Sequence, residues 1–226
     1  NQTGDKIESN IAIPTSTINY FDRLRKDYDM EGLDEATEKA LAYVMTNPVK
    51  TFNWQGQFED ISARQPYENQ SGEQACDLAI YLFRNNSKDP ESVKLAEELI
   101  RFSEDQFVIW ENPQPMPENG KAKGALPQNW ITPCVQEQYA YWRPIARSAG
   151  IMIDTYWEAY TVTGNEIYLA KAKSIANAFT VVQDAHDGDY PTHFTRYKMN
   201  FWLNNAVYPA KVMMNFQRRL EKEKGE

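Results

Sequence analysis

Residues 156–194 read YWEAYTVTGNEIYLAKAKSIANAFTVVQDAHDGDYPTHF, and they hold the clearest fold signal in the chain. Apolar side chains recur at helical spacing on both sides of Gly164 and Asn165. Glycine ends a helix because it adopts positive φ without a clash, and asparagine caps the start of the next one. A link this short makes the two helices antiparallel. The stretch therefore predicts a hairpin of helices over 148–164 and 166–183.

Helical periodicity continues through most of the chain, and strict alternation over several residues does not occur. Asp34 and Ser71 are placed to cap helices, and Pro90 suits a first helical turn. The sequence therefore predicts an all-α protein with little or no β-sheet. The further predicted helices cover 15–28, 34–45, 72–86, 90–110 and 198–222.

Charge and composition exclude several classes of protein. The chain has 226 residues and a formal net charge of −8, spread along its length. Nucleic-acid binding needs a basic patch, and an anionic membrane surface also attracts basic segments. No apolar run approaches the ~20 residues of a membrane helix. We therefore expect neither a nucleic-acid partner nor membrane insertion.

The cysteines and histidines are few. Cys76 and Cys134 lie far apart and form no CxxC pair, so we interpret them as buried thiols. His186 and His193 are the two histidines of the chain. The acidic residues around Gly188 resemble a calcium loop without its closing glutamate, and a turn with Gly188 at positive φ explains them better. We therefore expect no metal and no cofactor.

Aromatic residues make up 13% of the chain, with six Trp and thirteen Tyr. Such rings fill helical cores, and they also stack on the apolar faces of sugars. Many of them lie in the long connections predicted at 47–72, 111–133 and 184–196. Long loops in a compact domain are usually functional or disordered, and disordered segments avoid aromatics. We therefore expect these loops to be ordered and to line a cleft.

The hairpin pattern resembles a known superfamily. Thr163, Gly164 and Asn165, followed by Tyr168 and Leu169, are similar to the TGN-x-x-Y-L turn of the six-hairpin glycosidases. A second, looser copy is EQACDLAIYLFRNNSKDPESVKLAEELIRF at 73–102. The resemblance covers about two thirds of the chain. It implies an (α/α)6 toroid and carbohydrate activity, and it does not specify the reaction.

A complete toroid of this type has more helices than the sequence predicts. Six hairpins need twelve helices, and seven or eight are predicted here. We therefore expect part of a toroid over 15–226, preceded by a linker or disordered segment over 1–14. This domain is expected to be the C-terminal part of a longer chain. An additional domain or self-association would cover its open edge.

Polar residues mixed with aromatics mark the candidate site. Residues 129–150, NWITPCVQEQYAYWRPIARSAG, lack an apolar stripe and combine rings with charges. Such mixtures are costly to bury dry and stable along a wet cleft. The predicted catalytic residues are Glu137, Glu59 and Asp60. The predicted substrate-binding residues are Trp54, Gln57, Trp130, Tyr139, Tyr141, Arg143, His193, Trp202 and Asn205.

Three functions stay open on the sequence. A glycoside hydrolase needs two carboxyl groups, which Glu137 with Glu59 or Asp60 would supply. A polysaccharide lyase acting on a uronate would use Arg143 with a tyrosine or histidine base. A non-catalytic domain that binds glycan or protein is the third. We expect a carbohydrate ligand, hydrolase activity first, and a periplasmic or extracellular location, with a cytoplasmic location still open.

Overall fold

The computed structural model describes residues 12–54, 70–111, 130–137, 144–197, 201–223 and 225. The described chain forms two compact units. Unit 1 contains the described residues up to Gln106, and unit 2 contains those from Phe107 onward. Each unit is mainly helical and carries its own set of the predicted site residues.

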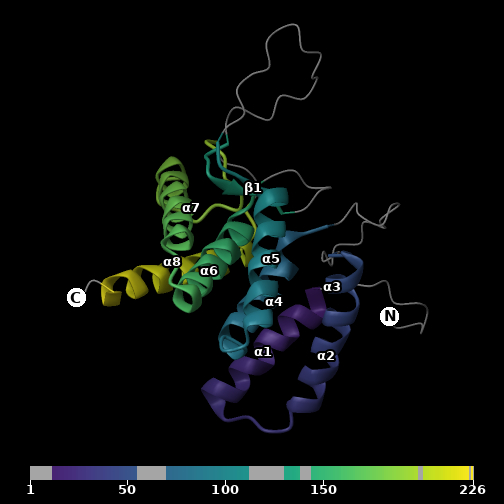
Figure 1. Cartoon of the computed structure of the whole chain (residues 1–226). Coiled ribbons are helices and arrows are strands. Elements are labelled where there is room, and N and C mark those ends of the chain that lie inside the picture. The colour runs from purple at the N-terminus through teal and green to yellow at the C-terminus, as the bar shows by residue number, and fades with distance from the viewer. Residues whose placement is uncertain are drawn as a thin grey trace, which may run out of the picture. The chain divides into compact units, whose positions relative to one another are not determined.

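Unit 1 is a group of helices packed around α1. Its elements are α1 (Ala12–Tyr28), α2 (Asp34–Thr46), α3 (Pro48–Thr51), α4 (Gly72–Asn85) and α5 (Pro90–Phe107). Helix α1 packs against both α2 and α4 (Figure 1). Ile18 of α1, Val44 of α2 and Leu78 of α4 are buried. The amphipathic pattern of each helix therefore supplies an apolar core for this unit.

The start of α4 is set by local chemistry and by one contact from α5. The side chain of Ser71 accepts a hydrogen bond from the backbone N–H of Glu73 at 3.3 Å, which confirms its predicted capping role. The hydroxyl of Ser103 on α5 donates to the carbonyl of Gly72 at 3.0 Å, and Ser103 is buried. This contact links α5 to the first turn of α4.

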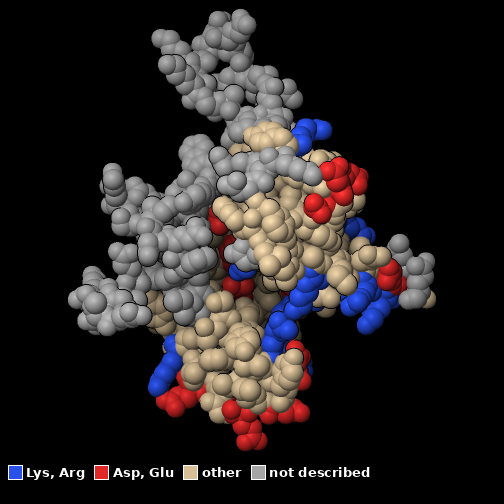
Figure 2. Space-filling model, turned by 180° about the vertical axis from the view of Figure 1, so that it is seen from behind, with Lys and Arg blue, Asp and Glu red and all other residues tan. Residues whose placement is uncertain are grey.

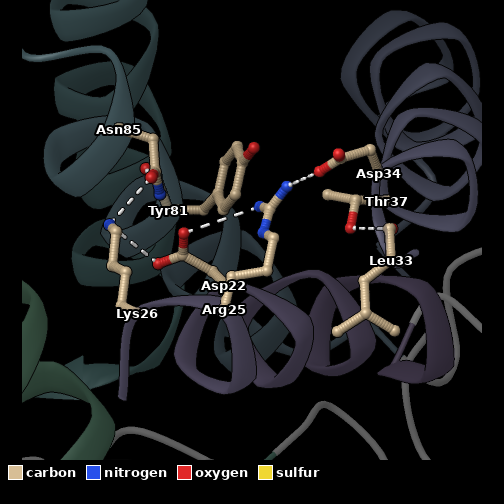
Figure 3. A network of polar contacts seen from close by, with 8 residues as sticks. All are labelled: Asp22, Arg25, Lys26, Leu33, Asp34, Thr37, Tyr81 and Asn85. Atoms are coloured by element: carbon tan, nitrogen blue, oxygen red, sulfur yellow. Dashed lines mark hydrogen bonds and ion pairs between the residues drawn. The ribbon is translucent and has the colours of Figure 1, made fainter. Parts of the chain in front are cut away.

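A polar network joins α1, α2 and α4 (Figure 3). The buried carboxylate of Asp22 lies 3.1 Å from Nζ of Lys26 and 3.7 Å from the guanidinium of Arg25. Lys26 also donates to Oδ1 of Asn85 on α4 at 2.9 Å, and Arg25 pairs with Asp34 at the start of α2. A buried carboxylate requires partners of this kind. We therefore interpret the network as structural.

The same network corrects one prediction. Asp34 was expected to cap α2, but it is the first residue of the helix and Leu33 precedes it without a capping side chain. The carboxylate of Asp34 binds Arg25 instead. A charged tertiary partner has replaced the local hydrogen bond that the sequence suggests.

Unit 2 places α6 between two partner helices. Its elements are β1 (Val108–Ile109), β2 (Cys134–Val135), α6 (Ala146–Thr163), α7 (Glu166–Ala185) and α8 (Asn204–Glu223). Helix α6 packs against both α7 and α8 (Figure 1). The largest buried side chains of this unit include Tyr156, Phe179 and Phe194. β1 and β2 pair antiparallel, with Val108 opposite Val135.

The α6–α7 hairpin follows the predicted pattern. Gly164 ends α6 with φ 68°, and its N–H donates to the carbonyl of Tyr160 at 2.8 Å. The side chain of Asn165 caps α7 by accepting from the N–H of Ile167 at 3.0 Å. Gly164 and Asn165 are the only residues between the end of α6 and the start of α7, so the predicted hairpin is confirmed.

Replacing Gly164 with valine is expected to lower the free energy of unfolding by about 1–2 kcal/mol. A Cβ on this residue would meet no atom within 4 Å, so the cost comes from the left-handed backbone alone. Chemical denaturation followed by circular dichroism measures the change. Gly164→Asn is the control, because asparagine tolerates this conformation and should lose less. Equal stability of both variants and the wild type would contradict this account.

Two other boundaries differ from the predictions. The helix expected over 90–110 ends at Phe107, because Val108 and Ile109 pair with β2 as a strand. The helix expected from 198 begins at Asn204, and residues 198–200 lie outside the described residues. The strands are two residues each, so the predicted all-α class with little sheet is confirmed over the described chain.

Basic and acidic side chains share one face of the described structure. On the face shown in Figure 2, Lys and Arg side chains are mixed with Asp and Glu side chains over the described residues. Across the same residues, every helix is too short or too polar to span a membrane.

Candidate functional site

The candidate site is built from four segments of unit 2, which we call the loop cluster. They are residues 130–137, 144–146, 190–197 and 201–205. The cluster contains five of the predicted site residues: Trp130, Glu137, His193, Trp202 and Asn205. It lies where the chain enters α6 and α8 and where it leaves α7.

Backbone hydrogen bonds join the first three of these segments. The N–H of Ile145 donates to the carbonyl of Val135 at 3.0 Å, and Ile145 also forms a bridge with His193. The N–H of Ile131 donates to the carbonyl of Phe194 at 3.0 Å, and Trp130 forms a bridge with Thr195. These pairings satisfy buried peptide groups in a region with almost no regular sheet. They hold the backbone of Trp130 and His193 in one network.

An aromatic contact anchors the cluster to α7. Phe194 is fully buried, and its ring meets Phe179 edge-on at 5.1 Å with an interplanar angle of 88°. Tyr190 contacts the same Phe179 ring at 5.5 Å. Edge-to-face aromatic pairs add stability beyond the area that they bury. The segment that carries His193 is therefore held on both sides by rings packed against α7.

The turn that leads out of α7 is shaped by left-handed residues. Asp187 has φ 59° and Gly188 has φ 86°, so the predicted positive φ of Gly188 is confirmed. The N–H of Gly188 donates to the carbonyl of Gln183 at 2.8 Å. Nε2 of buried His186 lies 2.8 Å from the carbonyl oxygen of Thr195. His186 thus links the turn to the loop cluster, which is a structural contact.

Trp202 is the most open of the predicted binding residues within the loop cluster. It is 41% exposed, and its ring meets the imidazole of buried His193 at 5.4 Å with an interplanar angle of 67°. The N–H of Trp202 donates to the hydroxyl of Thr192 at 2.7 Å. Phe201 and Tyr197 are exposed nearby in the sequence. The arrangement leaves Trp202 partly exposed, while the contacts with His193 and Thr192 keep it in place.

The remaining predicted residues of the loop cluster are less open. Trp130 and Asn205 are buried, and Glu137 is half-buried. Glu137 follows Gln136, which forms a bridge with Pro144, so it belongs to the same network. A buried Trp130 offers no face for stacking, and we therefore assign it a supporting role in the cluster. Asn205 is buried as well and receives the same supporting role, and the half-buried Glu137 remains a candidate ligand contact.

Trp54 lies in unit 1 and differs from what its sequence context suggests. It was expected to line a cleft, but it is 1% exposed. Its ring lies 6.4 Å from that of Phe102 on α5, and its carbonyl accepts a hydrogen bond from the N–H of Ser71 at 3.1 Å. Phe102 also meets Phe52 edge-on at 4.8 Å. This packing makes Trp54 a core residue of unit 1.

Several predicted residues cannot be compared with the structure. The following predicted residues lie outside the described part of the chain: Gln57, Glu59, Asp60, Tyr139, Tyr141 and Arg143. The predicted pairing of Glu137 with Glu59 or Asp60 therefore stays a prediction.

Sequence reasoning missed Thr192, Tyr197 and Phe201. Tyr197 and Phe201 are exposed in the structure, but their spacing continues the helical period of α8, so periodicity gives no signal for their exposure. The hydroxyl of Thr192 gives no signal either, because its partner is ten residues away.

The two cysteines are free and buried, as the sequence analysis favoured. Burial raises the pKa of the Cys134 thiol to about 12. The thiol therefore stays protonated near neutral pH and is a poor nucleophile. Among the described residues, no group of three His, Cys, Asp or Glu side chains is placed to hold a metal ion.

Comparison with known proteins relates the chain to helical enzymes. No protein-family model matches it, and no curated protein sequence does. The structure of D-mannose isomerase aligns with a TM-score of 0.57 and 15% identity, over 93% of this chain and 53% of that one. The GH76 α-mannanase of Bacteroides thetaiotaomicron aligns with a TM-score of 0.53 and 13% identity, over 96% of this chain and 73% of its own.

Likeness at such low identity establishes the fold. The chain shares the helical-hairpin fold of these two structures, so the predicted fold of the α/α-toroid type is confirmed. It spans about half the length of the D-mannose isomerase chain that it matches.

Proposed function

We propose that this chain is part of a carbohydrate-active protein and that the loop cluster of unit 2 binds a saccharide. The observation that carries this proposal is the partly exposed Trp202, whose ring contacts His193 and whose backbone N–H is held by Thr192. A flat ring with an open face stacks on the apolar face of a pyranose. Holding the ring in place before binding lowers the entropy that binding must lose.

A polar group of the cluster fits the hydroxyls of a sugar. Glu137 is half-buried and has carboxylate oxygens that can accept hydrogen bonds from hydroxyls. Binding sites for small ligands combine apolar surface with a few placed polar groups of this kind. The loop cluster supplies both from residues that are neighbours in the fold of unit 2.

The two similar structures suggest the sugar. One is named as a D-mannose isomerase and the other as an α-mannanase, and both names refer to mannose or a polymer of it. Because fold does not determine function, these names support the choice of ligand and nothing finer. We therefore propose mannose or a mannose-containing saccharide as the ligand to test first.

The reaction that we propose first is glycoside hydrolysis. It requires one carboxyl group that donates a proton and a second that acts as base or nucleophile. Glu137 in the loop cluster is the candidate for one of them. Glu59 and Asp60 stay the predicted candidates for the other.

A second candidate reaction is sugar isomerisation, and one observation favours it. The buried imidazole of His193 lies 5.4 Å from the ring of Trp202, so a histidine is part of the proposed site. Isomerisation of an aldose moves a proton between neighbouring carbons, and histidine is the commonest side chain for such transfers. Conversion of mannose to fructose would identify isomerisation. Release of mannose from mannan would identify hydrolysis.

Replacing Trp202 with alanine is expected to weaken binding of a mannose-containing saccharide by about tenfold, because the stacking face is lost. Titration calorimetry with methyl α-mannoside, mannobiose and soluble mannan measures the change. Tyr28→Ala is the matched control, because this aromatic is 72% exposed and lies in unit 1. Equal affinities of Trp202→Ala and the wild type would overturn the proposed site.

A further inference from the structure

Within the loop cluster, a buried hydroxyl joins the segment 201–205, which carries Trp202, to the segment 190–197. Thr192 is buried, and its Oγ1 accepts a hydrogen bond from the backbone N–H of Trp202 at 2.7 Å. This distance is short for an N–H donor and indicates a well-formed bond. The two residues are ten positions apart, so the bond crosses from one loop segment to another.

Thr192 is itself fixed by its neighbours. Its carbonyl accepts from the N–H of Ala146, the first residue of α6, at 2.8 Å. The next residue, His193, forms a bridge with Ile145, and Phe194 is anchored on α7. A hydroxyl mounted on so rigid a backbone can hold a less constrained segment in one position. The same backbone places the His193 ring beside Trp202.

We propose that Thr192 is a positioning residue of the saccharide site: its hydroxyl fixes the backbone of the Trp202 segment and so keeps the indole in contact with His193 and partly exposed. This inference rests on the proposed function of the loop cluster. Thr192 acts through Trp202, and its buried side chain has no direct role in stacking. Loss of the hydroxyl frees the segment, and binding must then order it.

Thr192→Val tests the proposal, because valine keeps the branched shape and removes the acceptor. The Trp202 amide should exchange with solvent deuterium about three- to tenfold faster, and mannose-containing saccharides should bind weaker by a similar factor. Thr192→Ser should restore both values, because it keeps the hydroxyl. Should the valine variant fail to fold, comparison of Thr192→Ser with Thr192→Ala gives the same contrast.

Thr155→Val is the matched control. Thr155 is buried in α6 of the same unit, and its hydroxyl donates to the carbonyl of Ile151 in its own helix at 2.7 Å. This variant should leave both the exchange of the Trp202 amide and the binding unchanged. A merely structural effect of removing a buried hydroxyl would appear here as well.

The outcomes separate the inference from the proposed function. Wild-type exchange at Trp202 in Thr192→Val, or failure of serine to restore it, overturns the positioning role. Unchanged binding in Thr192→Val beside weakened binding in Trp202→Ala overturns the role of Thr192 alone. If the wild-type chain binds none of the saccharides, the proposed function is overturned, and the role of Thr192 in binding is overturned with it.

Discussion

Replacing Trp54 with alanine is expected to lower the free energy of unfolding by about 3–5 kcal/mol, the usual cost of truncating a core tryptophan. Its side chain is 1% exposed and packs against Phe102 of α5. Truncation leaves a cavity between the start of α4 and α5, which the surrounding helices cannot fill completely. Urea denaturation followed by far-ultraviolet circular dichroism measures the loss.

Two variants make the result specific. Trp54→Phe keeps a ring at the contact with Phe102 and should lose less stability than alanine. Tyr28→Ala removes an exposed aromatic from the same unit and should stay within about 0.5 kcal/mol of the wild type. If Trp54→Ala keeps wild-type stability and loses saccharide binding, its ring is a ligand contact rather than a core residue.

Phe179→Ala is the second large change, with an expected loss of about 3–5 kcal/mol in the free energy of unfolding. Phe179 is fully buried on α7 and meets the rings of Phe194 and Tyr190 at 5.1 and 5.5 Å. The alanine variant loses the ring contacts that hold Tyr190 and Phe194 of the loop cluster on α7, and it leaves a cavity in the core. Denaturation measures the stability, and titration calorimetry measures the accompanying loss of saccharide binding.

Val181→Ala is the control for Phe179→Ala. Val181 lies on the same helix and is half-exposed, so its truncation should change stability by less than about 0.5 kcal/mol. Binding should stay at the wild-type level in this control. A Phe179→Ala protein with wild-type stability and binding would show that the loop cluster holds its shape without the anchor.

The sequence predicted helix ends correctly where the capping residue forms the cap with its own side chain or backbone. Ser71, Gly164 and Asn165 each satisfy or shape a helix end with their own atoms, and each was identified from its neighbours in the sequence. Asp34 was misjudged because its carboxylate has a stronger partner in Arg25 of another helix. A local propensity yields to a tertiary contact whenever the contact binds the same atoms more strongly.

Residue type guided the choice of candidate site residues, whereas the fold decides their exposure. Trp54 lies in a predicted connection and Trp202 in the helix predicted over 198–222, and both were predicted to bind substrate. Their surroundings differ in the fold: Phe102 of α5 packs beside Trp54, whereas Trp202 meets His193 and stays 41% exposed. Burial depends on residues distant in the chain, so local periodicity could not distinguish the two tryptophans.

The amino-acid order alone was enough for the all-α class, the α6–α7 hairpin and the type of ligand worth testing. Those features depend on helical spacing, on caps within a few residues, and on composition. The contacts of Thr192 with Trp202, and of Phe194 with Phe179, came from the folded chain alone. Such contacts join segments that are adjacent in space and not in sequence, and they form only after the helices have packed and brought their loops together.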